Sequence, residues 1–378
     1  MPAESLVSVG LAVPLRRRFD YVVPTDLPMP VIGARVRVPF GRRSTVGVVL
    51  AHPSTSALDP AQLRPLEAVL DATALLDAAL LRLLDWAATY YHEPCGEAVM
   101  QAVPKWLRDG RSLAELQPVS YVVSDAGRAA LDSNVLSRAP KQAAALRLII
   151  DAKRMSQSDL RQAAVTADVV RRLREREFIT AVRNAGTAAS VSVKAFEPAS
   201  DLPTLTDQQL AVVTGMREQD DGFRVNLLYG VTGSGKTEVY LRLIEDTLAR
   251  GRQALLLVPE IGLTPQLVAR LRERFAHGLA VLHSGLSDRE RCDAWQRARS
   301  GTAGLVVGTR SAVFAAMSQP GLIVIDEEHD PSYKQQTGFR YNARDLAIVR
   351  ARHADIPVVL GSATPSLESL QNARTGRY

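Results

Sequence analysis

Residues 230–237 read Gly-Val-Thr-Gly-Ser-Gly-Lys-Thr, and this stretch decides the fold. It satisfies the pattern G-x-x-x-x-G-K-[ST] and lies between a strand-like run at 226–229 and a helical pattern at 237–248. Glycines here let backbone N–H groups turn toward phosphates at a helix N-terminus, while the lysine reaches the β and γ oxygens and the hydroxyl ligates magnesium. The stretch therefore predicts an ATP site, formed by Gly230, Gly233, Ser234, Gly235, Lys236 and Thr237.

An acidic motif follows a second strand-like run. Residues 321–325 are apolar apart from the glycine, and Asp326-Glu327-Glu328-His329 comes directly after them, at the carboxyl end of the predicted strand. Asp326 can hold magnesium, usually through water, and Glu327 can orient and deprotonate the water that attacks the γ-phosphate. The predicted chemistry is ATP hydrolysis, with Lys236, Asp326 and Glu327 as catalytic residues and Mg²⁺ held by Thr237 and Asp326.

The surrounding sequence alternates between strand-like and helical patterns from about residue 205 onward. This alternation predicts a parallel sheet wrapped by helices, in a RecA-like lobe over residues 203–378. The strand-like runs are Asn226–Tyr229, Ala254–Val258, Leu279–Leu282, Leu305–Val307, Leu322–Ile325 and Val358–Leu360.

Two further domains precede this lobe. Residues 6–53 alternate apolar and polar positions between glycines and prolines, which predicts a small β-rich domain over residues 1–110. A helical pattern at 77–91 most simply covers its sheet. Helical patterns at 141–150, 156–163 and 167–176, followed by a strand-like run at 178–182, match a winged helix domain over residues 118–198.

The third of these helices carries several arginines, which could follow DNA phosphates or could simply be solvated. Winged helices also serve as spacers and protein docks, so the fold alone leaves both interpretations open. The arginines are Arg171, Arg172, Arg174 and Arg176.

Length and composition restrict the class of protein to which this chain can belong. With 378 residues the chain exceeds the roughly 250–300 residues at which single cores stop growing, so we expect a multidomain α/β protein. It contains no uninterrupted apolar stretch of about 18 residues and no export signal, so we expect a cytoplasmic protein without a membrane partner. Cys95 and Cys292 lack further ligands at suitable spacing, which excludes a disulfide framework and a cysteine zinc site.

The net charge of +6 fits nucleic acid but also fits many ordinary proteins. Its distribution is more informative, because seven arginines between residues 16 and 43 face only Asp20 and Asp26. Such a local surplus favours phosphate backbones, with a solvated basic face as the alternative. The seven are Arg16, Arg17, Arg18, Arg35, Arg37, Arg42 and Arg43.

Six short motifs resemble those of PriA-type DNA helicases, both in their residues and in their order along the chain. Residues 230–240 and 326–330 contain the two motifs described above. The others are Leu-Val-Pro-Glu-Ile-Gly-Leu-Thr-Pro-Gln at 257–266, His-Ser-Gly-Leu-Ser at 283–287, Val-Gly-Thr-Arg-Ser-Ala at 307–312 and Gly-Ser-Ala-Thr-Pro at 361–365. The resemblance covers essentially the whole chain.

The resemblance implies the first motor lobe of a superfamily-two helicase. In such a lobe Pro259 and Gly308–Arg310 would line the track for single-stranded DNA, and Gly361–Thr364 would couple the ATP state to lobe movement. Gln209 stands at the position of an adenine-reading glutamine. Residues 333–345 look like the family's aromatic-rich loop, in which rings stack on bases and cations meet the DNA backbone. The DNA-binding residues expected there are Tyr333, Lys334, Phe339, Arg340 and Tyr341.

The resemblance also reaches the N-terminal domain, which in the family holds the 3′ end of a nascent strand at a fork. Carried over by position, Phe19, Asp20, Tyr21 and Gly41 would form that pocket, and Arg64 stands where a lysine is common. A carboxylate can accept a hydrogen bond from a terminal 3′-hydroxyl, which only a strand end offers. Taken alone, Asp20 would more readily be interpreted as a turn-stabilising residue.

The resemblance implies an ATP-dependent 3′-to-5′ helicase that recognises stalled replication forks and starts primosome assembly. Forked and single-stranded DNA, primosome proteins and single-strand-binding proteins are the expected partners. The family continues beyond the position of Tyr378 with a second lobe, arginine fingers and a cysteine-rich zinc module, so zinc is expected only there. A non-motor fork-binding scaffold and another superfamily-two translocase, such as a restriction subunit, remain as alternatives.

Overall fold

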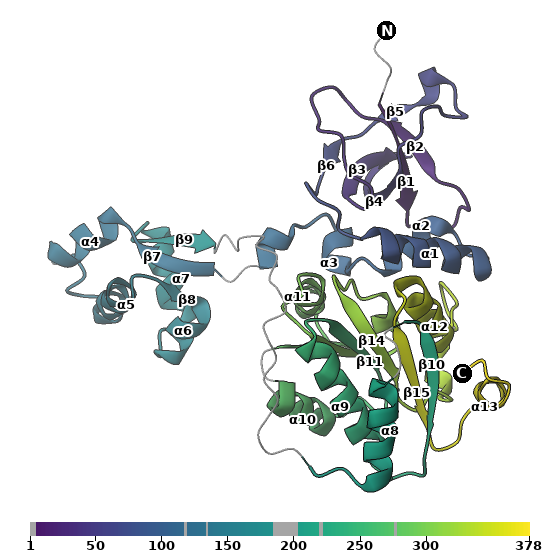
Figure 1. The fold of residues 1–378 in the computed structure, drawn as a ribbon. Helices are drawn as coiled ribbons and strands as arrows, with labels where there is room; N and C mark the ends of the chain where they lie inside the picture. The colour runs from purple at the N-terminus through teal and green to yellow at the C-terminus, as the bar shows by residue number, and fades with distance from the viewer. Residues whose placement is uncertain (1–4, 117–118, 134, 184–202, 219–221, 276–277) are drawn as a thin grey trace. The chain divides into compact units, whose positions relative to one another are not determined.

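The computed structural model describes residues 5–116, 119–133, 135–183, 203–218, 222–275 and 278–378. Within it the chain forms two compact units. The first combines residues 1–111 with residues 190–378, and the second spans residues 112–189. The β-rich domain and the nucleotide-binding lobe, which the sequence predicts as separate domains, thus belong to one unit (Figure 1).

A curled six-stranded sheet forms the first part of this unit. β1 (Leu6–Leu11) lies between β2 (Phe19–Val22) and β4 (Arg43–Ala51) and is antiparallel to both. β3 (Arg35–Phe40) pairs with β4 through a tight hairpin turn at Gly41, where the positive φ of 59° suits glycine. Short strands β5 (Arg64–Pro65) and β6 (Ala68–Val69) close the two edges. The prediction of a small β-rich domain is confirmed.

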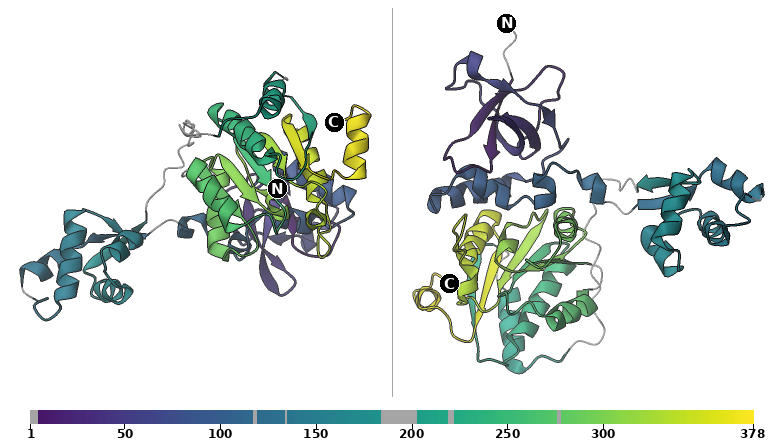
Figure 2. Two further views of the ribbon diagram at one scale, coloured as in Figure 1. Left: turned by 90° about the horizontal axis from the view of Figure 1, so that it is seen from below. Right: turned by 180° about the vertical axis from the view of Figure 1, so that it is seen from behind.

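Three helices follow the sheet: α1 (Ala78–Tyr90), α2 (Cys95–Gln101) and α3 (Lys105–Arg108). The sequence pattern indicated that the first of them covers the sheet. Instead α2 packs on β1 and β4, and α1 packs on α2 and on α12 of the lobe (Figure 2). Gly96 explains the close approach of α2, because a Cβ atom there would lie 1.9 Å from the carbonyl oxygen of Leu11.

The second unit is built around a three-stranded antiparallel sheet in the order β8-β7-β9, formed by Met155–Ser156, Val119–Val123 and Ile179–Arg183. The three expected helices are confirmed as α5 (Pro140–Asp151), α6 (Gln157–Gln162) and α7 (Ala167–Glu175). The structure adds α4 (Asp125–Asp132), which the sequence pattern did not indicate. Apolar residues of β7, α5, α7 and β9 form its core.

The lobe contains a six-stranded parallel sheet in the order β10-β15-β14-β11-β13-β12, which confirms all six expected strands. Their bounds are Arg224–Tyr229, Pro357–Ser362, Pro320–Ile325, Gln253–Leu257, Leu305–Gly308 and Leu279–Leu282. Apart from the edge strand β10, the strands are apolar and mostly buried, as expected for a parallel sheet covered by helices on both faces.

The helices of the lobe cover both faces of this sheet. α8 (Asp207–Arg217), α9 (Lys236–Ala249) and α10 (Pro265–Phe275) share one core cluster with alternate sheet residues. α12 (Ala343–Ala354) packs on β14 and β15, and α11 (Asp288–Arg299) packs beside β12. α13 (Leu367–Arg374) follows the last strand. None of the helices in the described ranges combines the length and apolar character that crossing a bilayer requires.

Arg35, one of the seven clustered arginines, is buried rather than available to phosphate. Its side chain is 1% exposed and makes a bidentate ion pair with Asp71, at 2.8 Å for both Nε and Nη2. Its Nη1 donates to the carbonyl oxygens of Leu107 and Arg111 at 2.7 and 2.8 Å. Arg35 therefore ties the curled sheet to the segment that carries α3, and the interpretation of this arginine as part of a basic DNA-facing surface is corrected.

We predict that Arg35→Met lowers the free energy of unfolding by about 3–5 kcal/mol, because the buried carboxylate of Asp71 loses its partner. Arg42→Met, at an exposed position of the turn between β3 and β4, removes the same charge and should change stability by less than about 0.5 kcal/mol. Urea denaturation of both variants measures the difference. Equal effects of the two substitutions would show that the Arg35 network does not support the sheet.

Candidate functional site

The nucleotide loop joins the end of β10 at Tyr229 to the start of α9 at Lys236. Gly233 and Gly235 adopt positive φ angles of 81° and 80°, which side-chain-bearing residues rarely adopt. At Gly235 a Cβ atom would also lie 2.3 Å from Nε2 of Gln209. Glycine is therefore required at these positions for the loop to fold over the N-terminus of α9.

Lys236 and Gln209 both bond to the loop itself. Lys236 Nζ donates to the carbonyl oxygen of Gly230 at 2.8 Å and to that of Val231 at 3.4 Å. Gln209 Nε2 donates to the carbonyl oxygen of Ser234 at 2.9 Å, while its Oε1 accepts from the backbone N–H of Thr206 at 3.0 Å. Gln209 thus braces the loop and caps α8 at once. Adenine recognition by Gln209 stays a prediction and would require one of these bonds to be exchanged.

The acidic motif lies at the same edge of the sheet as the loop. β15 separates β10 from β14, so the carboxyl ends of these two strands present Gly230 and Asp326 on either side of it. Burial first, and then the Glu327 carboxylate, raises the pKa of Asp326. Glu327 has a positive φ of 44°, and its Oε2 lies 3.6 Å from Nδ1 of His329. Strained backbone of this kind in a non-glycine residue is typical of functional sites.

These residues fit ATP and magnesium chemically. The N-terminus of α9 and the glycine loop can present N–H donors to phosphates, and Lys236 supplies a cation beside them. Mg²⁺ keeps several waters and takes few protein ligands, so the hydroxyl of Thr237 and the carboxylate of Asp326 suffice together with phosphate oxygens. Among the described residues no group of three or more His, Cys, Asp or Glu could hold a metal by itself.

Tyr240, one turn into α9, packs directly on β15. Its ring is fully buried, and a Cβ atom on Gly361 would lie 1.4 Å from its hydroxyl oxygen. Burial, and next the nearby Asp326 carboxylate, raises the pKa of Tyr240 far above its ordinary value, so this phenol stays neutral. Sequence spacing identified Gly361 only as part of a motif. The contact explains why glycine stands there.

Glu328 was not among the expected site residues, yet it joins three segments. Its side chain is fully buried and accepts hydrogen bonds from Arg344 Nη1 at 3.0 Å and from the backbone N–H of Ser366 at 2.6 Å. Ser369 Oγ adds a bond at 2.9 Å, and the backbone N–H of Glu328 donates to the carbonyl oxygen of Gly361 at 3.0 Å. The acidic motif, the end of the aromatic-rich segment and the Gly361–Pro365 motif therefore share one buried carboxylate.

The aromatic-rich segment packs inward in this structure. Tyr333, Phe339 and Tyr341 are only 2%, 2% and 5% exposed, and the rings of Phe339 and Tyr341 pack with that of Phe314. Tyr333 donates its hydroxyl to the carbonyl oxygen of Asp326 at 2.6 Å. Stacking of these three rings on bases stays a prediction and would require them to leave this cluster.

The charged members of the same segment are arranged differently from its rings. Lys334 and Arg340 are exposed and available to a DNA backbone. Arg310, the other predicted contact, turns inward: its Nη1 donates to the carbonyl oxygens of Ser332 at 2.9 Å and Lys334 at 3.2 Å. Arg310 therefore anchors the segment in this structure, and its contact with DNA stays a prediction.

All five residues expected in the strand-end pocket line one cavity of about 390 Å³. The cavity lies on the curled sheet and includes Phe19, Asp20, Tyr21, Gly41 and Arg64. They come from β2, the β3–β4 turn and β5, which are adjacent in space but separated in sequence.

Asp20 in this cavity is held by residues that sequence reasoning missed. Its carboxylate accepts hydrogen bonds from Ser8 Oγ and from Ser56 Oγ, the latter at 2.7 Å. Arg64 Nη1 donates to the carbonyl oxygen of Gly41 at 3.1 Å, and burial raises the pKa of Tyr21 to about 12. Pairing of Ser8 with Asp20 across β1 and β2 could have been found only from the strand register.

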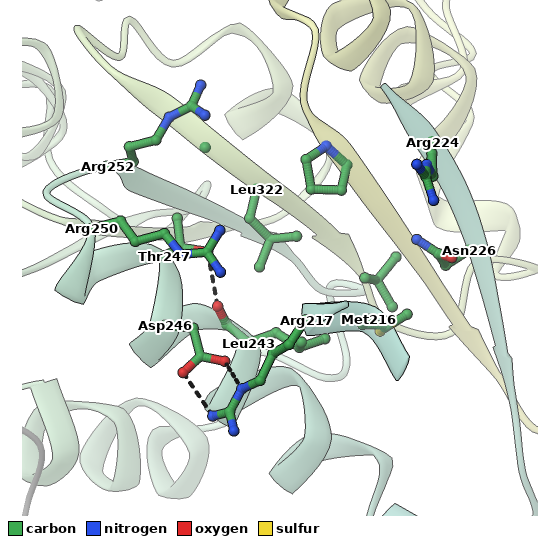
Figure 3. Close-up of a pocket in the computed structure, with 13 residues that line it drawn as sticks. Met216, Arg217, Arg224, Asn226, Leu243, Asp246, Thr247, Arg250, Arg252 and Leu322 are labelled. Atoms are coloured by element: carbon green, nitrogen blue, oxygen red, sulfur yellow. Dashed lines mark hydrogen bonds and ion pairs between the residues drawn. The ribbon is translucent and has the colours of Figure 1, made fainter. Parts of the chain in front are cut away.

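A smaller cavity of about 70 Å³ lies at the opposite edge of the lobe's sheet, near the amino ends of β10, β14 and β15 (Figure 3). Arginines gather around an apolar floor, and Arg217 makes a bidentate ion pair with Asp246 at 2.6 and 2.8 Å. No predicted site residue lines it.

Comparison with known proteins agrees with both parts of the first unit. Residues 8–104 match the family described as 3′ DNA-binding domain, and residues 206–373 match the DEAD/DEAH box helicase family. The chain is 43% identical to the replication restart protein PriA of Haemophilus influenzae, over 99% of this chain and 51% of that protein. It is 34% identical to PriA of Bacillus subtilis, over 100% of this chain and 55% of that protein. The chain thus spans about half the length of these relatives.

A solved structure of RecG bound to a three-way DNA junction aligns over 46% of this chain and 23% of that chain, with 26% identity. The TM-score of 0.36 is too low for an argument about how the domains are arranged.

We predict that Gly361→Ala destabilises the lobe by about 1–3 kcal/mol or more, because the added methyl group overlaps the phenol of Tyr240. Gly215→Ala in α8 is the matched control: it has no neighbour within 4 Å and should be neutral or stabilising by up to about 1 kcal/mol. Chemical denaturation of both variants measures the change in the free energy of unfolding. If Gly361→Ala is as stable as Gly215→Ala, the packing of Tyr240 on β15 is looser than described.

Proposed function

We propose that the chain provides the fork-binding and ATP-binding part of a 3′-to-5′ DNA helicase that restarts stalled or abandoned replication forks, because it is similar to about half of the replication restart protein PriA of two bacteria. The observation that carries this proposal is the joint presence, in one compact unit, of a strand-end cavity and a complete nucleotide loop with its acidic motif. Activity, substrates and partners of the whole protein are part of the proposal.

ATP would bind with its triphosphate over the glycine loop. Lys236 Nζ would exchange its bond to the Gly230 carbonyl oxygen for the β and γ oxygens, while backbone N–H groups at the start of α9 hold the phosphates. Thr237 and Asp326 would hold Mg²⁺, which would neutralise phosphate charge. Glu327, beside it at the edge of the sheet, would orient the attacking water and accept its proton.

Hydrolysis by this lobe alone is expected to be slow. In related motors an arginine from outside the lobe stabilises the transition state and contributes about 10³ to 10⁵ in rate. The relatives are roughly twice as long as this chain, and their remaining half is the proposed source of a second lobe, with zinc expected there as well.

The strand-end cavity would recognise a 3′-hydroxyl through Asp20. Both of its carboxylate oxygens already accept from serine hydroxyls, so an incoming 3′-hydroxyl would share or replace the bond from Ser56. Phe19, whose ring packs edge-on against Phe40 at 5.3 Å and carries the Arg17 guanidinium at 5.0 Å, would contact the terminal base.

The second unit is proposed to be a winged helix domain, on the order of its helices and strands. Two arginines of α7 already have acidic partners, since Arg171 pairs with Asp168 and with Glu175, and Arg172 pairs with Asp168. These exposed pairs are weak and can be exchanged for phosphates, so α7 remains a candidate DNA contact beside the alternative of a solvated face.

The aromatic-rich segment is proposed to report DNA binding to the acidic motif. It contacts Asp326 through Tyr333 and presents Lys334 and Arg340 to solvent, so a bound strand could alter the position of the catalytic carboxylates. Primosome and single-strand-binding proteins are the proposed partners, in the cytoplasm. A non-motor fork-binding scaffold is the second candidate, favoured by the inward packing of the segment's rings.

The proposal predicts ATP hydrolysis that rises when a fork with a 3′-hydroxyl nascent end is added. Lys236→Ala should abolish the stimulated turnover, because the β and γ oxygens lose their cation. Steady-state phosphate release with and without the fork measures both. Tight fork binding without turnover, even at high ATP, would favour the scaffold.

A separate prediction concerns the strand end. The chain should prefer a 3′-hydroxyl fork over a 3′-phosphate fork, and Asp20→Asn should reduce that preference by roughly tenfold or more, since a hydrogen bond to a charged group contributes about 1.5–3 kcal/mol. Asp26→Asn, exposed in the same domain, is the matched control. Fluorescence anisotropy with the two forks gives the ratio, and an unchanged ratio in Asp20→Asn removes Asp20 from the pocket.

A further inference from the structure

Tyr240 lies on the same face of α9 as Lys236, because residues four positions apart on a helix are neighbours. Its side chain is fully buried, and the hydroxyl end of its ring lies beside Gly361. A phenylalanine would keep the ring in place, so packing alone does not explain the hydroxyl. Tyr240 is also not among the site residues that the sequence predicted.

The hydroxyl of Tyr240 is buried without a partner. Its oxygen makes no hydrogen bond of ordinary geometry within the described part of the chain. A buried hydroxyl that leaves its donor unused costs free energy, and buried polar groups in folded proteins therefore nearly always have a partner. We expect this donor to be used when the nucleotide site is occupied.

The carboxylate of Asp326 is the group placed to accept the hydrogen. Leu360 pairs with Ile325, so Gly361 beside the phenol is next to Asp326 on the neighbouring strand. Burial first, and then the carboxylate of Asp326, raises the pKa of Tyr240, so the two groups are close in space. The neutral phenol can donate and an ionised carboxylate can only accept, which sets the direction of the bond.

The backbone of Asp326 is already held on both sides. Its N–H donates to the carbonyl oxygen of Leu257 at 2.9 Å, and its C=O accepts from the hydroxyl of Tyr333 at 2.6 Å. Rotation of the side chain is therefore the freedom that matters for a bound metal. A hydrogen bond to one carboxylate oxygen would restrict this rotation and leave the other oxygen for Mg²⁺ and its waters.

We propose that the hydroxyl of Tyr240 donates to the carboxylate of Asp326 when ATP and Mg²⁺ are bound, and that Tyr240 is a positioning residue for the metal. This inference rests on the proposed ATP-binding function and adds a residue to that site. Tyr240 would act only through Asp326 and would contact neither ATP nor the metal. Its ring packs on Gly361, so the position of the hydroxyl also depends on the strand that carries the Gly361–Pro365 motif.

The test compares Tyr240→Phe with the parent chain, because this variant keeps the ring and removes only the hydroxyl. The dissociation constant of mant-AMP-PNP, a fluorescent non-hydrolysable ATP analogue, is measured in excess EDTA and in saturating Mg²⁺. Hydrogen bonds to metal-ligating side chains typically contribute about 10- to 100-fold in metal affinity. Mg²⁺ keeps several waters, so we expect the lower limit: the gain in affinity caused by Mg²⁺ should fall severalfold, up to about tenfold, with the affinity in EDTA unchanged.

Tyr121→Phe is the matched control, because it removes the same atom from a buried tyrosine in the core of the second unit and should leave the Mg²⁺ effect unchanged. A double-mutant cycle with Asp326→Ala separates positioning from packing. In that background Thr237 and the phosphates still hold Mg²⁺, and Tyr240→Phe should have no further effect on the gain in affinity. Thermal melting of every variant excludes loss of fold.

An unchanged Mg²⁺ effect in Tyr240→Phe would overturn the inference and leave the proposed function intact. An equal loss of affinity in EDTA and in Mg²⁺ would also overturn it, because the hydroxyl would then support the nucleotide loop and not the metal. The same holds if Tyr240→Phe has the same effect with and without the Asp326 side chain. Failure of the parent chain to bind the analogue would overturn the proposed ATP-binding function together with the inference.

Discussion

The contact between Tyr240 and Gly361 is the constraint on which the nucleotide site depends. β15 lies between β10, which leads into the nucleotide loop, and β14, which ends just before Asp326. The packing of β15 therefore sets the spacing between the nucleotide loop and the acidic motif. Tyr240 belongs to the helix that begins at Lys236, and its phenol fills the space that any side chain at position 361 would need. The helix proposed to bind phosphate and the strand beside the proposed catalytic carboxylates are therefore packed as one piece.

A series of buried contacts connects the nucleotide site to the aromatic-rich segment that is proposed to contact DNA. Glu328 connects the acidic motif to Arg344, at the end of the aromatic-rich segment, and to Ser366, just after the Gly361 motif. The segment continues the path to the N-terminal domain, because the backbone N–H of Asn342 donates to the hydroxyl of Tyr91 at 3.2 Å. Removing one partner from a buried charge pair is costly, so movements of these segments are expected to be coupled rather than independent.

The sequence alone was sufficient to predict the features that depend on local pattern. The loop at 230–237, the acidic motif and all six lobe strands could be located from spacing and periodicity alone, because each is encoded within a few residues. Contacts between segments that are distant in the sequence could not be predicted in this way. Periodicity identified a helix at 77–91 but gave no sign that Gly96 of the next helix makes the close approach to the sheet. The sequence of residues 333–341 does not show whether the aromatic rings face bases or pack inward. The inward packing of Phe339 on Phe314 depends on tertiary structure.

The central claim is that nucleotide and DNA act on one connected body. The most direct test measures the affinity of the chain for a non-hydrolysable ATP analogue with and without saturating 3′-hydroxyl fork DNA, and then the affinity for the fork with and without the analogue. Coupled sites must change each other's affinity by the same factor, and couplings of 1–3 kcal/mol correspond to roughly 5- to 150-fold. The account predicts equal factors clearly different from one. Two affinities that each stay unchanged would mean that the sites are merely neighbours in one chain.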